Sequence, residues 1–338
     1  MRIADFLIRN PQSEIRNKTN FVVIGLMFHY LKPDTLNEAL MLLVDEKGRY
    51  PLLAGGTDLL VQWKSTSTYP SGIIDIGKLE ELMLIIEREN TIEIGSLVTH
   101  STMINSKIVT RCCPTLAAAC ETIGAIQIQN RGTIGGNIVT ASPAGDLPPV
   151  LMAFDAVLEL THLGGSRRVP IREFYLSYRN TALQPNEILT KIIIPKQRAD
   201  ERSVFYKVGT RKAQAISKVA LCVRSLIIPP NPPLEKGGAD RNSPLWKRGG
   251  GGDLMMQNGV IEDIAIALGS VAPTVIRAPN TEGYLKGKKL DPSIIEEARK
   301  MLSTEVVPID DIRSTADYRR FVAGNLLARY LNELTSPL

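Results

Sequence analysis

The sequence holds few of the residues that build metal sites. Its cysteines are Cys112, Cys113, Cys120 and Cys222, and no two of them form a Cys-x-x-Cys pair. Neighbouring cysteines such as Cys112 and Cys113 are poorly placed to bind one metal ion, and iron–sulfur clusters need spaced cysteine ligands. We therefore expect no metal site, and we expect buried, reduced thiols in a cytoplasmic protein.

Catalytic sets made of side chains are also missing. The three histidines, His29, His100 and His162, lie far apart, and none belongs to a His-x-x-x-His pair. Each is predicted to be structural, and no catalytic residue is predicted because no Ser-His-Asp set or acid–base pair stands out. Such an absence is compatible with a protein whose demanding chemistry belongs to a bound cofactor.

Long apolar runs and charge of a single sign are lacking too. No run has the roughly 20 apolar residues that cross a bilayer, and the N-terminus lacks the order of a secretory signal. The 40 basic and 35 acidic residues are interspersed, so nucleic-acid binding is not indicated. With 338 residues, 44% of them hydrophobic, the chain is typical of a soluble protein of about two domains.

Hydrophobic periodicity predicts an α+β chain with two regions. Residues 1–26 are taken as an N-terminal extension of uncertain order, and regular structure is expected from Met27. The first region, 27–200, is expected to have two parts, about 27–80 and 81–200. Its predicted elements are helices at 33–48 and 114–124, strands at 51–54, 72–79, 91–99 and 187–195, and a hairpin at 155–171 turning at Gly164–Gly165.

The second region, 201–338, is expected to pair two long strands and to end in two helices. The second strand is predicted at 259–271 and the helices at 292–305 and 314–335. Between the strands, residues 229–253 are dense in proline, glycine and charge, which predicts a disordered insertion at a hairpin tip. The alternative is that Trp246 within it is a docking anchor.

Two glycine motifs are the most informative local features. "LLAGGTDLL" (52–60) follows a short apolar run, and taken alone it is more often a plain turn. "RGTIGGN" (131–137) also combines a threonine with two adjacent glycines. Consecutive backbone N–H groups in conformations open to glycine can form a nest that binds a phosphate. Two such nests would suit a pyrophosphate, with Thr57, Thr133 and Asn137 as side-chain donors.

Asp146 follows the second motif. Its carboxylate could accept a hydrogen bond from a ribose or ribityl hydroxyl. Equally, it could be a turn-forming residue before Pro148–Pro149. The spacing alone leaves both readings open.

Several stretches together resemble a known family. "PLLAGGTDLLVQWK", "RGTIGGNIVTASPAGDLPPVLMAFDAVLEL" and "IALGSVAPTVIRA" are similar to the FAD-binding, medium-sized subunit of the molybdenum hydroxylases. That family includes carbon monoxide dehydrogenase, xanthine dehydrogenase, nicotinate dehydrogenase and 4-hydroxybenzoyl-CoA reductase. The resemblance runs from about Met27 to the C-terminus, in the family's order.

The resemblance implies a set of FAD-binding residues. By position they fall into a pyrophosphate cradle, two side chains that pack on the cofactor, an aspartate near the ribityl chain and a lysine that approaches the flavin. The cradle is Leu53, Ala54, Gly55, Gly56, Thr57, Asp58 and Leu59 with Thr133, Ile134, Gly135, Gly136 and Asn137; the others are Ile123, Leu189, Asp146 and Lys218. For Lys218 the alternative is a solvated strand residue.

The same resemblance implies fold, partners and activity. The expected fold is a two-part FAD-binding domain of the vanillyl-alcohol-oxidase (PCMH-like) type over 27–200, then a smaller C-terminal domain with an antiparallel sheet and a helix bundle. The expected partners are a large molybdenum–pterin subunit and a small subunit with two [2Fe–2S] clusters, in a dimer of heterotrimers. Electrons would leave through FAD to NAD or another acceptor.

Two alternatives stay open. One is a non-catalytic assembly module that keeps the fold without the flavin, and the other is a stand-alone FAD oxidase. The intact glycine motifs favour a flavin over the first. The second would need a substrate base or a His or Cys tether, and no clear candidate stands out. Residues 229–253 contain no cysteine, so the extra [4Fe–4S] cluster of the 4-hydroxybenzoyl-CoA reductase members is not expected.

Overall fold

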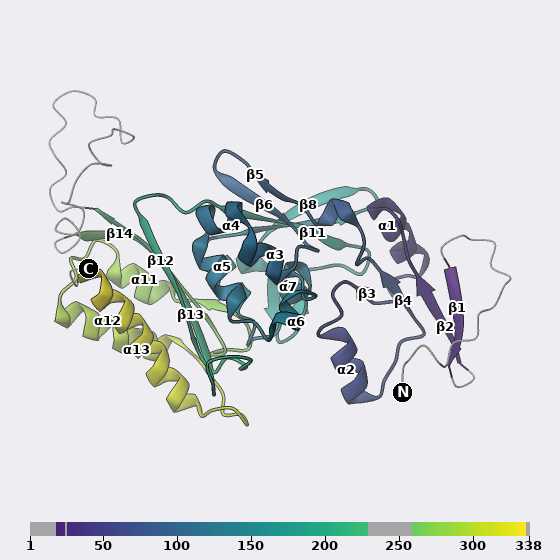
Figure 1. Ribbon diagram of the computed structural model, residues 1–338. Helices are drawn as coiled ribbons and strands as arrows, with labels where there is room; N and C mark the ends of the chain where they lie inside the picture. The colour runs from purple at the N-terminus through teal and green to yellow at the C-terminus, as the bar shows by residue number, and fades with distance from the viewer. Residues whose placement is uncertain (1–17, 24–25, 229–258, 336–338) are drawn as a thin grey trace. The chain divides into compact units, whose positions relative to one another are not determined.

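The computed structural model describes residues 18–23, 26–228 and 259–335. Contacts between Cα atoms divide the chain into two compact units (Figure 1). The first comprises Met1–Ser142 and Asp155–Lys196, and the second comprises Pro143–Phe154 and Gln197–Leu338. The domain limits expected from the sequence stay predictions, and the expected insertion at 229–253 lies outside the described residues.

The first sheet of unit 1 carries the first glycine motif at its edge strand. Strands β2 and β3 both run parallel to β4, and β1 pairs antiparallel with β2. In sheet order the strands are β1 (Lys18–Val23), β2 (Leu26–Leu31), β4 (Gly72–Asp75) and β3 (Leu52–Leu53). Regular structure begins before the expected Met27, because Lys18–Val23 form β1, which pairs antiparallel with β2.

Helix α1 (Leu36–Asp45) covers this sheet because its apolar residues recur at helical spacing. Ala39, Leu40 and Leu43 are buried together with Ile74 of β4. The Thr35 hydroxyl accepts the N–H of Glu38 and caps the helix.

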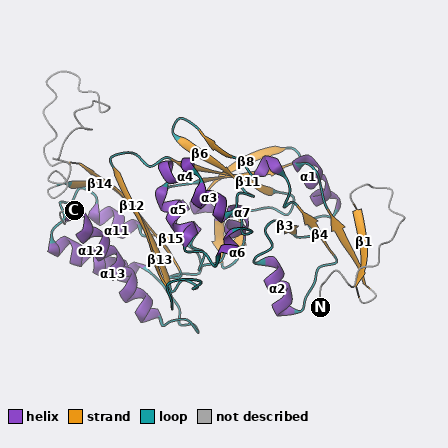
Figure 2. Ribbon diagram, in the orientation of Figure 1, coloured by secondary structure: helices purple, strands orange, loops and turns teal. Residues whose placement is uncertain are grey.

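The second sheet of unit 1 is antiparallel and carries a layer of short helices (Figure 2). Its order is β5 (Ile85–Glu87), β6 (Thr91–Gly95), β11 (Ile188–Pro195), β7 (Val157–His162) and β8 (Gly165–Pro170). The remaining elements of the unit are α2 (Leu59–Thr66), a 3-10 turn (Glu80–Leu82), α3 (His100–Asn105), α4 (Lys107–Cys112), α5 (Pro114–Glu121), α6 (Ile126–Gln129), α7 (Ile134–Val139), α9 (Ile171–Phe174) and the small pair β9 (Tyr175–Ser177) and β10 (Asn180–Thr181). The predicted 155–171 hairpin is confirmed as β7–β8.

Unit 2 is an antiparallel sheet packed against helices. The strands, in order, are β12 (Glu201–Val208), β13 (Val219–Ile228), β14 (Val260–Gly269) and β15 (Ile276–Arg277). The helices are α8 (Leu147–Ala153), α11 (Pro279–Leu285), α12 (Pro292–Glu305) and α13 (Ala316–Thr335). In Figure 1, α12 and α13 lie side by side, and α13 packs on β13. The pairing of the two long strands is confirmed, and the chain has the α+β character that the sequence predicts.

Candidate functional site

The first glycine motif forms the loop between β3 and α2. Gly56 has a φ of +73°, which turns the chain in a conformation that other residues rarely adopt. Among the described residues, no acceptor receives a hydrogen bond from the backbone N–H groups of residues 55–59. Successive unpaired N–H groups in a turn are the basis of an anion-binding nest, so this loop fits a phosphate group without a lysine or arginine.

Close packing joins the two glycine motifs. A Cβ atom on Gly55 would overlap the carbonyl oxygen of Arg131 and lie 3.2 Å from the Cα of Gly132. A second link comes from Asp58, whose carboxylate accepts hydrogen bonds from the Thr140 hydroxyl at 3.3 Å and from the Gln62 amide. The two motifs are therefore in direct contact at Gly55, and Asp58 is engaged by a residue just beyond the second motif.

The second motif is the first turn of α7, and its N–H groups already have acceptors. Those of Ile134 and Gly135 donate to the carbonyls of Val98 and Ser96, at 3.0 and 2.9 Å. The Thr133 hydroxyl caps Gly136 at 3.0 Å, and the Thr133 carbonyl accepts from Asn137 at 3.0 Å.

The expectation of a second nest of free N–H groups is therefore wrong. Neither glycine of this motif has the positive φ that such a nest uses. Gly135 is needed for packing, since a Cβ there would lie 2.6 Å from the Cβ of Ser96. Gly136 differs, because only the Thr133 hydroxyl, at 3.0 Å, would be near its Cβ.

Unpartnered polar atoms surround the second motif. The side-chain oxygens of Ser96 and Asn137 and the Nδ1 of His100 are buried and have no hydrogen-bond partner among the described residues. Burial lowers the pKa of His100 to about 4, so its imidazole is neutral at physiological pH. Buried polar atoms without partners are uncommon and mark a place where a ligand or water completes the structure.

The two predicted packing residues occupy different surroundings. Ile123 is half-buried just after α5. Leu189 is 4% exposed in β11, opposite Leu160, so it belongs to the core of the second sheet. Helix α7 packs against β11, which brings the strand of Leu189 next to the second motif.

Asp146 lies in unit 2 and does not behave as a turn residue. It occupies the N-cap position of α8, but its side chain makes no capping bond. Instead its carboxylate accepts from Lys207 Nζ at 2.6 Å and from the Ser217 hydroxyl at 2.5 Å. Burial raises the pKa of Asp146, while Lys207 and Ser217 act in the opposite direction.

Lys207 is the lysine beside this aspartate, and the approach of Lys218 to the flavin stays a prediction. The ammonium of Lys218 lies 5.1 Å from the centre of the Tyr318 ring, a cation–π contact that keeps it engaged elsewhere in the unit. Sequence reasoning missed Lys207 because nothing local marks it. Lys207 is recognised only from its ion pair with the Asp146 carboxylate, 61 residues earlier in the chain.

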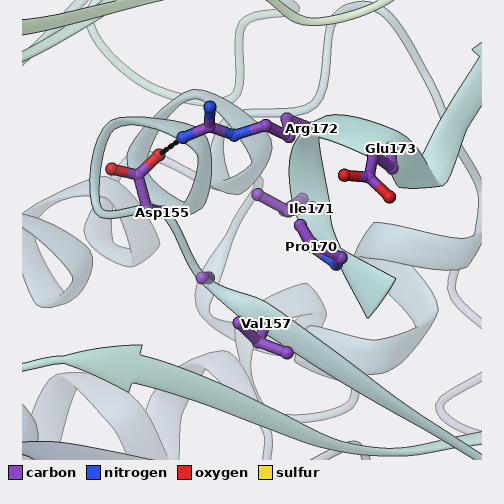
Figure 3. A pocket seen from close by; sticks show the side chains of 7 residues that line it. Asp155, Val157, Pro170, Ile171, Arg172 and Glu173 are labelled. Carbon is purple, nitrogen blue, oxygen red and sulfur yellow. Dashed lines mark hydrogen bonds and ion pairs between the residues drawn. The ribbon is translucent and has the colours of Figure 1, made fainter. Parts of the chain in front are cut away.

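A surface pocket of about 360 Å³ lies elsewhere in unit 1 (Figure 3). It is lined by Asp155, Ala156, Val157, Pro170, Ile171, Arg172 and Glu173, and the Arg172 and Asp155 side chains point toward one another as an ion pair at 2.5 Å. None of the predicted cofactor residues lines it.

Residues 26–197 match the FAD-binding domain of molybdopterin dehydrogenases, and residues 249–334 match the C-terminal domain of carbon monoxide dehydrogenase flavoproteins. The chain belongs to the FAD-binding subunits of the molybdenum hydroxylases. It is a flavoprotein oxidoreductase subunit, and its cofactor is FAD.

Named relatives of this FAD-binding subunit extend over nearly its whole length. It is 31% identical to the carbon monoxide dehydrogenase medium chain of Hydrogenophaga pseudoflava, over 90% of this chain and 96% of that one. It is 27% identical to the xanthine dehydrogenase FAD-binding subunit of Escherichia coli, over 90% and 94%.

Solved structures of carbon monoxide dehydrogenase share the fold of this FAD-binding subunit. The Hydrogenophaga pseudoflava enzyme superposes with a TM-score of 0.78, covering 90% of this chain and 96% of that one. A chain of the Oligotropha carboxidovorans enzyme, 26% identical, has a TM-score of 0.77 with 92% and 98% covered. Within the described part of this subunit, no helix combines the length and apolarity of a membrane span.

Proposed function

We propose that this subunit binds FAD with the first glycine motif as its pyrophosphate cradle and passes electrons from [2Fe–2S] clusters of a partner subunit to NAD or another acceptor. The observation that carries the proposal is the row of unpaired N–H groups at residues 55–59. Bound FAD supplies the redox chemistry, because a flavin accepts single electrons and releases a pair. The polypeptide binds and orients the cofactor.

The proposed roles of individual residues are supported by their surroundings and by the family resemblance. The N–H groups of residues 55–59 donate to the phosphates, and Thr57 adds a hydroxyl. Gly135 and Gly136 present backbone without side chains, and the Asn137 amide oxygen accepts a hydrogen bond that it now lacks. In line with the family resemblance, Asp146 accepts from a ribityl hydroxyl. Asp58 stabilises the loop through the hydrogen bonds that its carboxylate accepts from Gln62 and Thr140.

The assembly and the finer fold type are part of the same proposal. We propose a large molybdenum–pterin subunit and a small [2Fe–2S] subunit as partners, in a cytoplasmic dimer of heterotrimers. Relatives are named medium chains or subunits, which supports a multi-subunit complex. We propose the vanillyl-alcohol-oxidase type for the FAD-binding domain at 27–200, followed by the C-terminal domain at 201–338.

A visible spectrum tests FAD binding. The purified chain, with and without added FAD and after removal of free flavin, is expected to show bound-flavin absorption bands. A colourless protein that takes up no FAD would contradict the proposal and favour the flavin-free assembly module. Reduction of bound flavin by a reduced [2Fe–2S] partner, followed by reoxidation with NAD, tests the electron-transfer part separately.

A further inference from the structure

The first sheet of unit 1 places an aspartate at the strand end beside the first glycine motif. Strands β3 and β4 run parallel, and Leu53, the last residue of β3, lies opposite Asp75, the last residue of β4. Neighbouring parallel strands end at the same edge of a sheet, where α/β folds bind their ligands. Asp75 therefore lies beside the point where the chain enters the loop with the unpaired N–H groups.

Two donors hold Asp75, one on each carboxylate oxygen. The hydroxyl of Tyr30, on the neighbouring strand β2, donates to Oδ2, and the N–H of Gly77 donates to Oδ1 at 2.9 Å. A hydrogen bond to an ionised carboxylate is roughly twice as strong as one between neutral groups. Burial, together with the bond to Asp75, raises the pKa of Tyr30 to about 12, so its hydroxyl keeps its proton at neutral pH.

The turn after β4 supports the start of the cradle. The N–H of Ile76 donates to the Leu53 carbonyl at 3.0 Å. A Cβ atom on Gly77 would lie 3.1 Å from the carbonyl oxygen of Ala54, so this turn packs directly against the Ala54 backbone. The row of unpaired N–H groups at residues 55–59 begins immediately after these two supported residues.

The Asp75 carboxylate has no cation to balance it. Among the residues that the structure describes, no lysine or arginine forms an ion pair with it. Like charges repel, so the charge of this carboxylate opposes the binding of a pyrophosphate nearby. Its value to the cradle therefore lies in the hydrogen bonds that it accepts and not in its charge.

We infer that Asp75 is a positioning residue whose turn fixes the backbone from which the cradle starts, and that Tyr30 holds the Asp75 carboxylate for this task. The inference rests on the proposed function, since it assigns the purpose of the pair to pyrophosphate binding. All the contacts that carry it lie within unit 1. Neither side chain is assigned a contact with the flavin.

A double-mutant cycle on FAD affinity tests the inference. Asp75→Ala is expected to weaken FAD binding about tenfold, because it releases the turn that supports the cradle. Tyr30→Phe should weaken binding about fivefold in the otherwise unchanged chain. In the Asp75→Ala background the same change should cost less than about twofold, since the carboxylate that the hydroxyl holds is gone.

Asp75→Asn separates positioning from charge. The asparagine oxygen can accept from Gly77 and its amide can donate to the Tyr30 hydroxyl, so both hydrogen bonds are kept while the negative charge is removed. We expect this variant to bind FAD at least as tightly as the unsubstituted chain does. A loss as large as that of Asp75→Ala would overturn the inference, because positioning does not need the charge.

Tyr206→Phe is the matched control. Tyr206 lies on β12 in unit 2, is half-buried like Tyr30, and its hydroxyl donates to a carboxylate oxygen of Glu333 at 2.6 Å. Both tyrosine variants should lower the melting temperature of the FAD-free protein by similar amounts, whereas only Tyr30→Phe should weaken FAD binding.

The outcomes separate the two claims. A chain that binds no FAD at all contradicts the proposed function. If the chain binds FAD but Tyr30→Phe costs nothing, costs the same in both backgrounds, or costs no more than Tyr206→Phe, the inference about the pair is overturned. Should Asp75→Ala fail to fold, the comparison of Tyr30→Phe with Tyr206→Phe decides alone.

Discussion

Adjacent motif glycines meet different physical demands. Gly55 has no space for a Cβ because the Arg131 carbonyl presses against it, and Gly56 needs its positive φ. Gly136 is less constrained, since its φ is not positive and the one atom close to a Cβ there, at 3.0 Å, is the hydroxyl oxygen of Thr133 that caps the helix. Because no backbone atom blocks a Cβ at Gly136, we expect the approach of the cofactor to be the main demand on this position.

Gly136→Ala should therefore weaken FAD binding while leaving the fold intact. We expect a loss of affinity of about 5- to 150-fold, by analogy with the roughly 1–3 kcal/mol that overpacking costs. The melting temperature of the FAD-free protein should hold or rise, because alanine is the better helix former. Gly283→Ala in α11, also a helical glycine with open space, serves as control and should leave affinity unchanged. Equal FAD affinity in both variants would show that the cofactor does not pass Gly136.

Gly55→Ala should damage the fold and FAD binding together. The added methyl group would have to push apart the backbones of the two motifs, at a cost of about 1–3 kcal/mol or more. Urea unfolding of the FAD-free protein measures this, and an unchanged midpoint would mean that the loops separate freely.

Among single residues, the sequence indicates which positions are locally distinctive, but not which distant residues contact them. The motif glycines, Thr133 and Asp146 stand out because their local patterns are distinctive. Lys207 and Ser217 do not, since the fold alone brings them to Asp146 from 61 and 71 residues away. The expectation of a second nest was wrong for the same reason. The carbonyls that accept from the N–H groups of Ile134 and Gly135 belong to residues 98 and 96, which lie distant in the sequence.

At the scale of elements, local signals decide how well a boundary is predicted. Helix α12 is found at the predicted residues, 292–305, because Asp291 caps it and Pro292 begins it. Helices α3 and α4 were not predicted. They are six residues each and carry too short a pattern for helical periodicity to show.

Asp311 holds the segment before α13 through ion pairs with Arg319 and Arg313, and its ionisation gives this segment a definite pH dependence. Burial alone would raise the pKa of Asp311, but its bonds to Arg319 and to the N–H groups of Arg313 and Ser314 lower the pKa to about 2. The ionised carboxylate therefore stabilises the fold above its ordinary pKa of 3.8, and this contribution is lost as the pH falls from about 4 through 2.

Asp311→Asn should lower the free energy of unfolding by about 1–3 kcal/mol at pH 7, because it leaves the buried Arg319 without its anion. The difference from the unsubstituted chain should shrink between pH 4 and pH 2. Asp317→Asn is the control, since the Asp317 side chain is 96% exposed and its pair with Arg320 contributes little. A difference that does not change with pH would contradict this account.

For the whole molecule, FAD should act as a stabilising ligand. A ligand that binds only the folded state at a hundred times its Kd adds about 2.7 kcal/mol to the free energy of unfolding. Thermal scans at increasing FAD concentration should therefore show a rising melting temperature. A flavin-free assembly module would show no rise in melting temperature with FAD. FMN, which lacks the second phosphate, is the control and should raise the melting temperature less than FAD does.

The route of the chain constrains how this protein can be made. The polypeptide passes between the two units at residues 142/143, 154/155 and 196/197. Helix α8, buried at every position, packs on β13 and β14, whose residues leave the ribosome more than 60 residues later. During synthesis this apolar helix therefore emerges before the strands that cover it, and such transiently exposed apolar surface makes an incomplete chain prone to aggregation.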